Sequence, residues 1–256
     1  MVYIIYILAG LGAGIVTGLA GLSAAVIITP LLVSVCGWQS YDAVNVALAS
    51  DVLASLLSAY TYYKNKNIDL KRGVYVAITA FIGTIVGSYC GYLFSQGNPD
   101  GLGYISMATT ILLGVKFLWK PVTGGMDAAV TRKLDNKTRK AMVCGAVIGW
   151  VCGFTGSGGG VLMLMVFTLV LGYNLKIAVG TSTMIMSLVA LTGSVSHIAM
   201  GAKIYPFPMF CIIVACLFGA VVSARFANRC EIKKLNRIVG CVLLVLRVIT
   251  LVIKLV

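Results

Sequence analysis

Two glycine-rich stretches carry the residues of this chain that are best suited to bind an anion. They are GLAGLSAAV at residues 18–26 and GFTGSGGGV at residues 153–161, and each interrupts a long apolar run. A glycine inside a helix costs ~1 kcal/mol relative to alanine, so each stretch predicts a break between two helices. The helix that restarts after such a break presents unpaired N–H groups and a partial positive charge, which together favour an anion.

The predicted substrate-binding residues lie at these breaks and in the helices that follow them. Glycine lets a ligand approach the backbone closely, and a serine at each break could cap the restarting helix. The glycines could alternatively serve only close helix packing, and hydroxyls inside helices often bond back to the backbone. The predicted substrate-binding set is Gly21, Ser23, Ala24, Asn45, Thr155, Gly156, Ser157, Gly158, Gly159, Gly160, Thr181 and Ser182.

Three ionisable residues inside apolar segments are candidates for coupling or gating: Asp51, His197 and Arg247. A carboxylate in the membrane is costly unless it is paired, protonated or hydrated, so Asp51 could bind a coupling proton or cation, or pair with Arg247. Arg247 could hold an oxyanion, form a structural ion pair or extend toward the interface. The single histidine, His197, could be a protonation switch or a packed imidazole near a helix end.

The composition excludes a water-soluble protein. Of 256 residues, 60% are hydrophobic and only 11% are charged, whereas soluble domains are about 25% charged. Several apolar runs exceed the ~20 residues that cross a bilayer, and they are apolar on all faces, which predicts helices. There is no basic polar domain that could bind nucleic acid, and the eight cysteines form no CxxC pair. The sequence therefore predicts no metal site and no cofactor.

The apolar runs define the predicted elements, which begin and end within about three residues of the stated positions. Each of the two long runs is interrupted near its middle and is interpreted as a helical hairpin that returns to the face it entered from; whether its arms cross the bilayer fully is left open. The predicted elements are a hairpin at 2–37; helices at 42–63, 73–95 and 102–119; a linker at 120–140; a hairpin at 141–172; and helices at 177–200, 206–227 and 237–255.

The basic residues predict the orientation. The net charge is +13, and the basic clusters fall in three polar segments, near 64–72, 120–140 and 225–237. Placing all of them in the cytoplasm, as the positive-inside rule requires, alternates the loops consistently and puts both termini outside. We therefore expect a multi-pass protein of the cell membrane with a cytoplasmic linker at 120–140.

The two halves of the chain, 1–119 and 141–256, share a glycine framework. With an offset of 135 residues, Gly14, Gly18, Gly21 and Gly37 correspond to Gly149, Gly153, Gly156 and Gly172. Chance matching in a glycine-rich apolar chain is the alternative. The predicted orientation inverts one half relative to the other, an arrangement typical of secondary transporters with a site near the membrane midplane. The predicted fold is an all-α polytopic membrane protein of two inverted-topology repeats, each a Gly-broken helical hairpin plus three transmembrane helices.

Residues 149–201 resemble the TauE/SafE sulfite-exporter family, also called TSUP. The matching features are the GFTGSGGG turn, the AVGTS run at 178–182 and the spacing from His197 to Gly201. The first half carries a weaker copy, with AVNVALAS in place of AVGTS, and KNKNIDL at 64–70 is similar to a basic turn of the family. The resemblance covers nearly the whole chain.

The resemblance implies a secondary transporter, often an exporter, of small anions such as sulfite, sulfonates or sulfur-containing organic acids. The expected partners are an anion (sulfite, sulfonate, thiosulfate or carboxylate) and the lipid bilayer; a coupling proton or cation, which Asp51 could bind, and a homo-oligomer are left open. Two departures put sulfite itself in doubt. Ser23-Ala24-Ala25 replaces the usual glycines of the first break, and Asp51 stands where an uncharged residue is more usual.

Two other functions compete with a carrier. A passive anion channel could use the same helix N-termini. An intramembrane serine hydrolase could use Ser157 as nucleophile and His197 as base, but a GxSG motif needs glycine where Thr155 stands, and His197 is predicted to lie near the outer surface. We therefore expect that the protein is not an enzyme.

Overall fold

The structure is a computed structural model that describes residues 2–97, 135–155, 160–169 and 171–231, with single positions at 234, 235, 237, 238, 241 and 245. The predicted helix at 102–119, most of the helix at 237–255 and most of the linker lie outside the described residues. The described helices are α1 (Val2–Ala20), α2 (Ala25–Cys36), α3 (Ser40–Lys64), α4 (Leu70–Gly97), α6 (Asp135–Thr155), α7 (Gly160–Leu169), α8 (Leu175–Ala199) and α9 (Pro206–Arg229).

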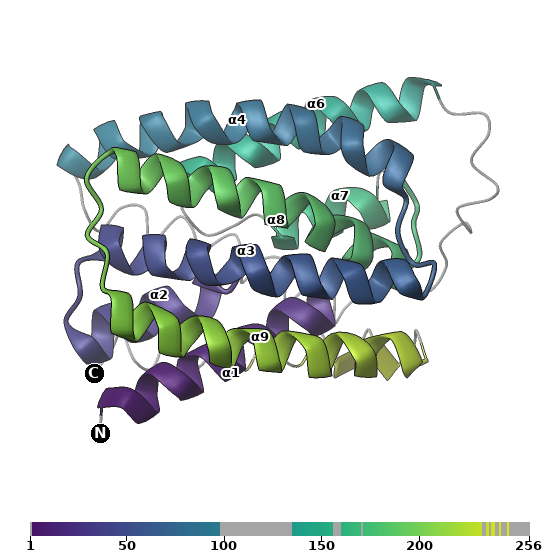
Figure 1. Cartoon of the computed structure of the whole chain (residues 1–256). Coiled ribbons are helices and arrows are strands. Elements are labelled where there is room, and N and C mark those ends of the chain that lie inside the picture. The colour runs from purple at the N-terminus through teal and green to yellow at the C-terminus, as the bar shows by residue number, and fades with distance from the viewer. Residues whose placement is uncertain are drawn as a thin grey trace.

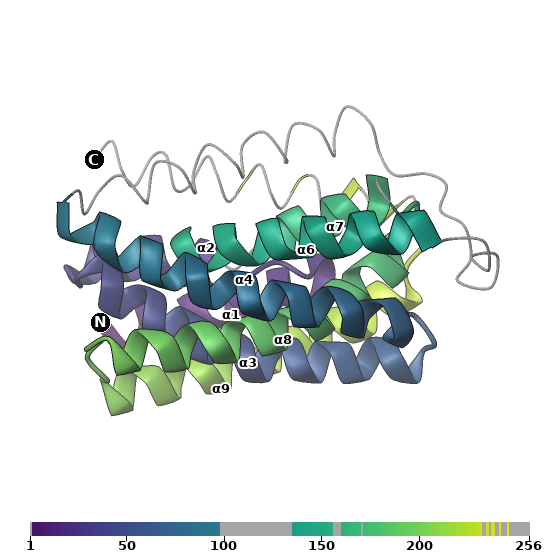
Figure 2. The ribbon, with the colours of Figure 1, turned by 90° about the horizontal axis from the view of Figure 1, so that it is seen from above.

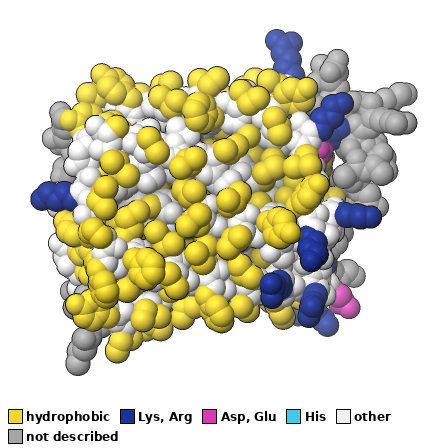
Figure 3. All heavy atoms as spheres, in the orientation of Figure 1, with side chains coloured by type: hydrophobic (Ala, Val, Ile, Leu, Met, Phe, Trp, Pro, Cys, Tyr) yellow, Lys and Arg dark blue, Asp and Glu magenta, His cyan; other side chains and the backbone are white. Residues whose placement is uncertain are grey.

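The described helices have the length and surface of membrane-spanning segments. Five of them are long and apolar enough to cross a bilayer. Large hydrophobic side chains such as Ile82, Phe210 and Phe218 are exposed on their outer sides, and Figure 3 shows hydrophobic groups over most of one face of the molecule. Lipid accepts such a surface without cost, whereas water does not. The predicted all-helical, multi-pass membrane protein is confirmed to this extent.

The helices share one long direction and lie in successive rows, as Figures 1 and 2 show. The extensive contacts are those of α1 with α9, α4 with α6, and α3 with α8. In Figure 1, α3 and α8 therefore form the middle of the molecule, with the α4–α6 pair on one side and the α1–α9 pair on the other. In each outer pair, a helix from the first half of the chain packs against a helix from the second half.

Glycines make these two outer helix pairs unusually close. A methyl group added to Gly14 of α1 would overlap the carbonyl oxygen of Cys216 in α9, and one added to Gly149 of α6 would overlap the carbonyl oxygen of Ala80 in α4. Small residues four apart let helix backbones touch in this way within membranes. Part of the repeated glycine framework therefore serves helix packing, which is the alternative that the sequence left open.

This packing predicts different effects for two glycines of α1. Gly14→Ala is expected to lower the free energy of unfolding by about 1–3 kcal/mol, because the added methyl forces α1 away from α9. Gly12→Ala is the matched control: the nearest atom to its added methyl is a side-chain carbon of Ile27 at 3.8 Å, so stability should stay the same or rise. Denaturant unfolding in detergent micelles measures both. Equal stability of the two variants would contradict the close α1–α9 contact.

The first broken run is a hairpin whose ends meet. α2 ends at Cys36, and the ring of Trp38 that follows lies 6.2 Å from the ring of Tyr6 near the start of α1. α1 and α2 thus enter and leave at the same end of the molecule, as Figure 1 shows for this purple-to-blue part of the chain. The turn between them consequently lies within the helical bundle and not at its surface.

Basic residues gather at the opposite end of the molecule. In the described residues this end comprises the α3–α4 turn, the start of α6, the α7–α8 turn and the end of α9, and Figure 3 shows most of the visible Lys and Arg side chains there. Its basic residues include Lys64, Lys66, Lys71, Arg72, Arg139, Lys176, Arg225 and Arg229. Lys203 lies in the α8–α9 turn at the other end. The charge therefore separates along the helix direction as the positive-inside rule requires of a membrane protein.

Candidate functional site

The first break is built by a left-handed glycine and a buried tyrosine. α1 ends at Ala20, and Gly21 follows with φ of +63°, a conformation that other residues adopt only with strain. The hydroxyl of Tyr62 in α3 donates a 3.0 Å hydrogen bond to the carbonyl oxygen of Gly18. This bond satisfies one of the last carbonyl groups of α1, which have no partner within the helix. The chain then turns through residues 21–24 and restarts as α2 at Ala25.

The carboxylate of Asp51 lies at the start of α2. It accepts hydrogen bonds from the Ser23 hydroxyl and from the Ala24 backbone N–H at 2.8 Å, and the Thr17 hydroxyl lies 3.5 Å away. Ser23 Oγ in turn accepts from the N–H of Ala25 at 3.1 Å. Asp51 is fully buried near the middle of α3. The carboxylate is therefore surrounded by donors from the end of α1 and from the break before α2.

This arrangement places a carboxyl group of the chain itself where the sequence predicts a bound anion. The N-terminus of a helix carries about half a positive charge, which stabilises a carboxylate that would otherwise be costly in the membrane. Of the two partners that the sequence left open for Asp51, Arg247 lies outside the described residues. The described partners are hydroxyl and amide donors, and they include two predicted substrate-binding residues, Ser23 and Ala24.

The described part of the second break adjoins the first. α6 ends at Thr155 and α7 begins at Gly160; Gly156, Ser157, Gly158 and Gly159 lie outside the described residues. A methyl group added to Gly160 would overlap the carbonyl oxygen of Gly21 and lie 3.0 Å from Cα of Leu22. The start of α7 and the turn between α1 and α2 are thus in backbone contact, although they are far apart in sequence.

α8 borders the same region through Ser182 but not through Thr181. A methyl group added to Gly21 would lie 2.6 Å from Ser182 Oγ, and that hydroxyl donates to the carbonyl oxygen of Val179 at 2.9 Å. The Thr181 hydroxyl instead accepts from the backbone N–H of Asp69 at 3.1 Å. Both residues were predicted to bind substrate, but they lie in different surroundings. Ser182 lies beside the first break, whereas Thr181 binds the α3–α4 turn.

Asn45 and His197 take part in two buried contacts between α3 and α8, each with a different partner. The Ser194 hydroxyl donates to Asn45 Oδ1 at 3.0 Å, and the rings of Tyr41 and His197 stack with centroids 4.5 Å apart. Among the described residues, Asn45 Nδ2 and His197 Nδ1 have no hydrogen-bond partner. Asn45 of α3 contacts α8, and His197 of α8 contacts α3. None of the contacts described for these two residues is with the first break.

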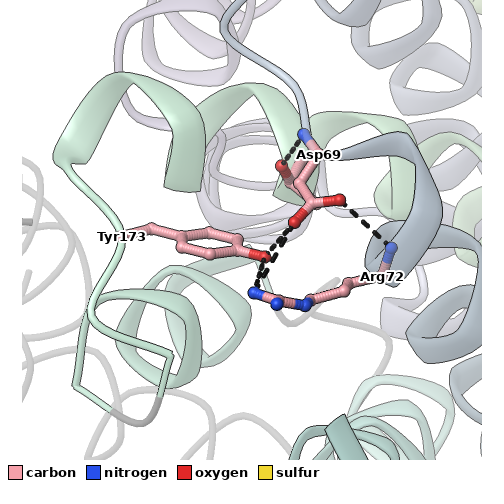
Figure 4. Close-up of polar contacts among 4 residues, drawn as sticks. Asp69, Arg72 and Tyr173 are labelled. Atoms are coloured by element: carbon pink, nitrogen blue, oxygen red, sulfur yellow. Dashed lines mark hydrogen bonds and ion pairs between the residues drawn. The ribbon is translucent and has the colours of Figure 1, made fainter. Parts of the chain in front are cut away.

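A polar cluster that the sequence analysis did not single out connects the two halves at the basic end. Figure 4 shows it: Tyr173, between α7 and α8, donates its hydroxyl hydrogen to the Asp69 carboxylate, which also lies 3.9 Å from the Arg72 guanidinium. The Asp69 and Arg72 side chains are only 14% and 13% exposed. Burial raises the pKa of the Tyr173 phenol well above its usual value, so the phenol stays a donor. The feature of the sequence that could have indicated this cluster is Asp69, an acidic residue within the basic segment KNKNIDL at 64–70.

Removing the Tyr173 hydroxyl tests this connection. Tyr173→Phe is expected to lower the free energy of unfolding by about 1–3 kcal/mol, because the partly buried Asp69 carboxylate loses a charge-assisted hydrogen bond. Tyr63→Phe in the exposed part of α3 is a matched control and should change little. Thermal unfolding in detergent measures both. A Tyr173 variant as stable as the control would mean that the cluster does not hold the two turns together.

The family model described as "Sulfite exporter TauE/SafE" matches residues 6–249. This chain belongs to the TauE/SafE family. No solved structure matches it.

Relatives of this TauE/SafE chain carry transporter names. "Probable membrane transporter protein YunE" of Bacillus subtilis is 26% identical, covering 96% of each chain. "Probable membrane transporter protein YdhB" of the same organism is 25% identical over 84% of this chain and 86% of its own length. "Probable membrane transporter protein MJ0441" of Methanocaldococcus jannaschii is 20% identical over 89% of this chain and 84% of its own. The chain is thus a member of a membrane transporter family and not an enzyme.

Proposed function

We propose that this TauE/SafE protein is a secondary transporter that moves small anions, such as sulfite, sulfonates or other sulfur-containing organic acids, out of the cell. It lies in the cell membrane with both termini outside. The halves 1–119 and 141–256 act as inverted repeats, each with a broken hairpin and three helices. The substrate binds between the two breaks, near the membrane midplane, and is exposed to each side in turn.

One observation carries this proposal: the start of α7 at Gly160 touches the turn at Gly21 and Leu22. Two helices therefore begin next to one another inside the bundle, and the partial positive charge of each is directed into the same region. The packing of α1 with α9 and of α4 with α6 supports the inverted-repeat arrangement. In both pairs, a helix of one proposed repeat packs against a helix of the other. Rocking of the repeats would pivot about the central α3–α8 contact.

The substrate contacts divide unequally between the breaks. The N–H groups at the start of α2 are already paired with Asp51 and Ser23, so we assign the substrate chiefly to the second break, residues 156–160, with Ser182 beside it. A substrate anion near the Asp51 carboxylate would be repelled by its negative charge. Anion binding is therefore easiest when Asp51 takes up a proton, which makes a proton the coupling ion.

Proteoliposomes test the proposal directly. Purified protein is reconstituted and supplied with labelled sulfite, a sulfonate, thiosulfate or a small carboxylate, with and without an imposed pH gradient. We expect movement of at least one anion that depends on the imposed pH gradient and is accompanied by proton movement. If none of the four moves under any gradient, the transport proposal is wrong. Large unitary currents in planar bilayers would instead indicate a passive channel.

A further inference from the structure

A groove lies between α3 and α9 at the basic end of the molecule, away from the breaks. Its volume is about 580 Å³, and its walls come from the last two turns of each helix. Lys64, Arg225 and Arg229 contribute the charges, and Leu57, Tyr60 and Val221 contribute most of the apolar surface. Both helices end at this side of the molecule, as Figure 1 shows, so the groove opens where the membrane meets the basic surface.

The three cations of the groove have no partner among the described residues. Lys64, Arg225 and Arg229 are exposed, and no ion pair or hydrogen bond joins their side chains to another described group. Two described carboxylates follow these cations closely in the sequence, Asp69 after Lys64 and Glu231 after Arg229. Each is already paired with another cation, Asp69 with Arg72 and Glu231 with Lys234. Within the part of the chain that the structure describes, the groove therefore holds three positive charges without a compensating carboxylate, which favours an occupant with negative charge.

The uncharged part of the groove points to an occupant that is also apolar. Arg225 and Val221 are one turn apart on α9, and Lys64, Tyr60 and Leu57 descend α3 in successive turns from its end. The charges thus lie toward the helix ends and the apolar side chains toward the membrane interior. Leu57 and Tyr60 are 39% and 65% exposed. A free inorganic anion would use the charges and leave this apolar wall uncovered.

We propose that the groove binds an anionic phospholipid. Its phosphate lies among Lys64, Arg225 and Arg229, and an acyl chain lies along Leu57 and Val221. Basic pockets between transmembrane helices on the cytoplasmic side are suited to such headgroups. The lipid would contact α3 from the first half of the chain and α9 from the second. This lipid site is separate from the proposed substrate site. The proposal of a lipid site therefore does not depend on whether the protein transports sulfite.

Two triple variants with the same change of charge test the site. The groove variant is Lys64→Gln, Arg225→Gln and Arg229→Gln; the control is Lys71→Gln, Arg139→Gln and Arg237→Gln, three exposed residues of the same types that do not line the groove. Native mass spectrometry measures the affinity of each for phosphatidylglycerol and phosphatidylcholine. We expect the groove variant alone to lose phosphatidylglycerol affinity, by roughly 100-fold, because each of the three cations near a membrane adds a factor of about five.

A third variant separates a lipid from a free phosphate. Leu57→Trp keeps all three charges and fills the apolar wall, so it should weaken phosphatidylglycerol binding and leave binding of soluble glycerol phosphate unchanged. Equal loss in the groove and control variants, no loss in either, or unchanged lipid affinity in Leu57→Trp would each overturn the proposal. All substitutions are at exposed positions, and thermal unfolding checks that each variant is folded before its affinity is compared.

Discussion

Asp51→Asn is expected to transport its anion at a rate that no longer depends on the pH gradient. Asparagine keeps the size of the side chain and can still accept from the Ala24 N–H, but it carries no charge and takes up no proton. Under the proposed mechanism, the start of α2 then stays permanently free of a competing anion. Initial rates in proteoliposomes, with and without an imposed pH difference, measure the effect. A pH dependence equal to that of the unsubstituted protein would assign Asp51 to structure alone.

Asp51→Leu separates the structural role from the coupling role. It leaves the Ser23 hydroxyl and the Ala24 N–H buried without their acceptor, at a cost of ~1–3 kcal/mol each. We therefore expect a marked loss of stability, larger than that of Asp51→Asn.

Asp42→Asn is the matched control for Asp51→Asn, since Asp42 is a second buried carboxylate of α3 and accepts from the Lys203 N–H at 2.9 Å, far from the breaks. It should lower stability while the pH dependence of transport is retained.

Gly160→Ala is expected to abolish transport or reduce it at least tenfold. The added methyl would overlap the carbonyl oxygen of Gly21 and lie 2.7 Å from Met186 Sδ, so the two breaks must move apart. A misplacement of about 1 Å at a site built for close backbone approach can cost two orders of magnitude in rate. Concentration-dependent uptake in proteoliposomes measures the maximal rate and the half-saturation concentration.

Gly14→Ala serves as the control for Gly160→Ala. Its added methyl also overlaps a backbone carbonyl, that of Cys216, but in the α1–α9 helix contact and not at the breaks. Both variants should lose a similar amount of stability, about 1–3 kcal/mol. Only Gly160→Ala should also raise the half-saturation concentration. If the two variants transport alike once their stability is taken into account, the region between the breaks is not the substrate site.

The positions of the membrane helices could be predicted from the sequence because the signal for each is local. A bilayer demands ~20 consecutive apolar residues, and glycine weakens a helix wherever it stands. The run at 42–63 corresponds to α3 at Ser40–Lys64, and the run at 206–227 to α9 at Pro206–Arg229. Positive charge in turns is equally local, so the basic end of the molecule could also be predicted from the sequence.

Contacts between distant residues were decided only by the tertiary structure. The sequence identifies Asp51 as an unusual carboxylate, but not its place at the start of α2, 28 residues from Ser23. It does not tell Thr181, bound to the α3–α4 turn, from Ser182 beside the first break. The reason is physical: length and hydropathy determine whether a segment spans a membrane, whereas the partner of a buried polar group depends on how the helices rotate and pack against one another.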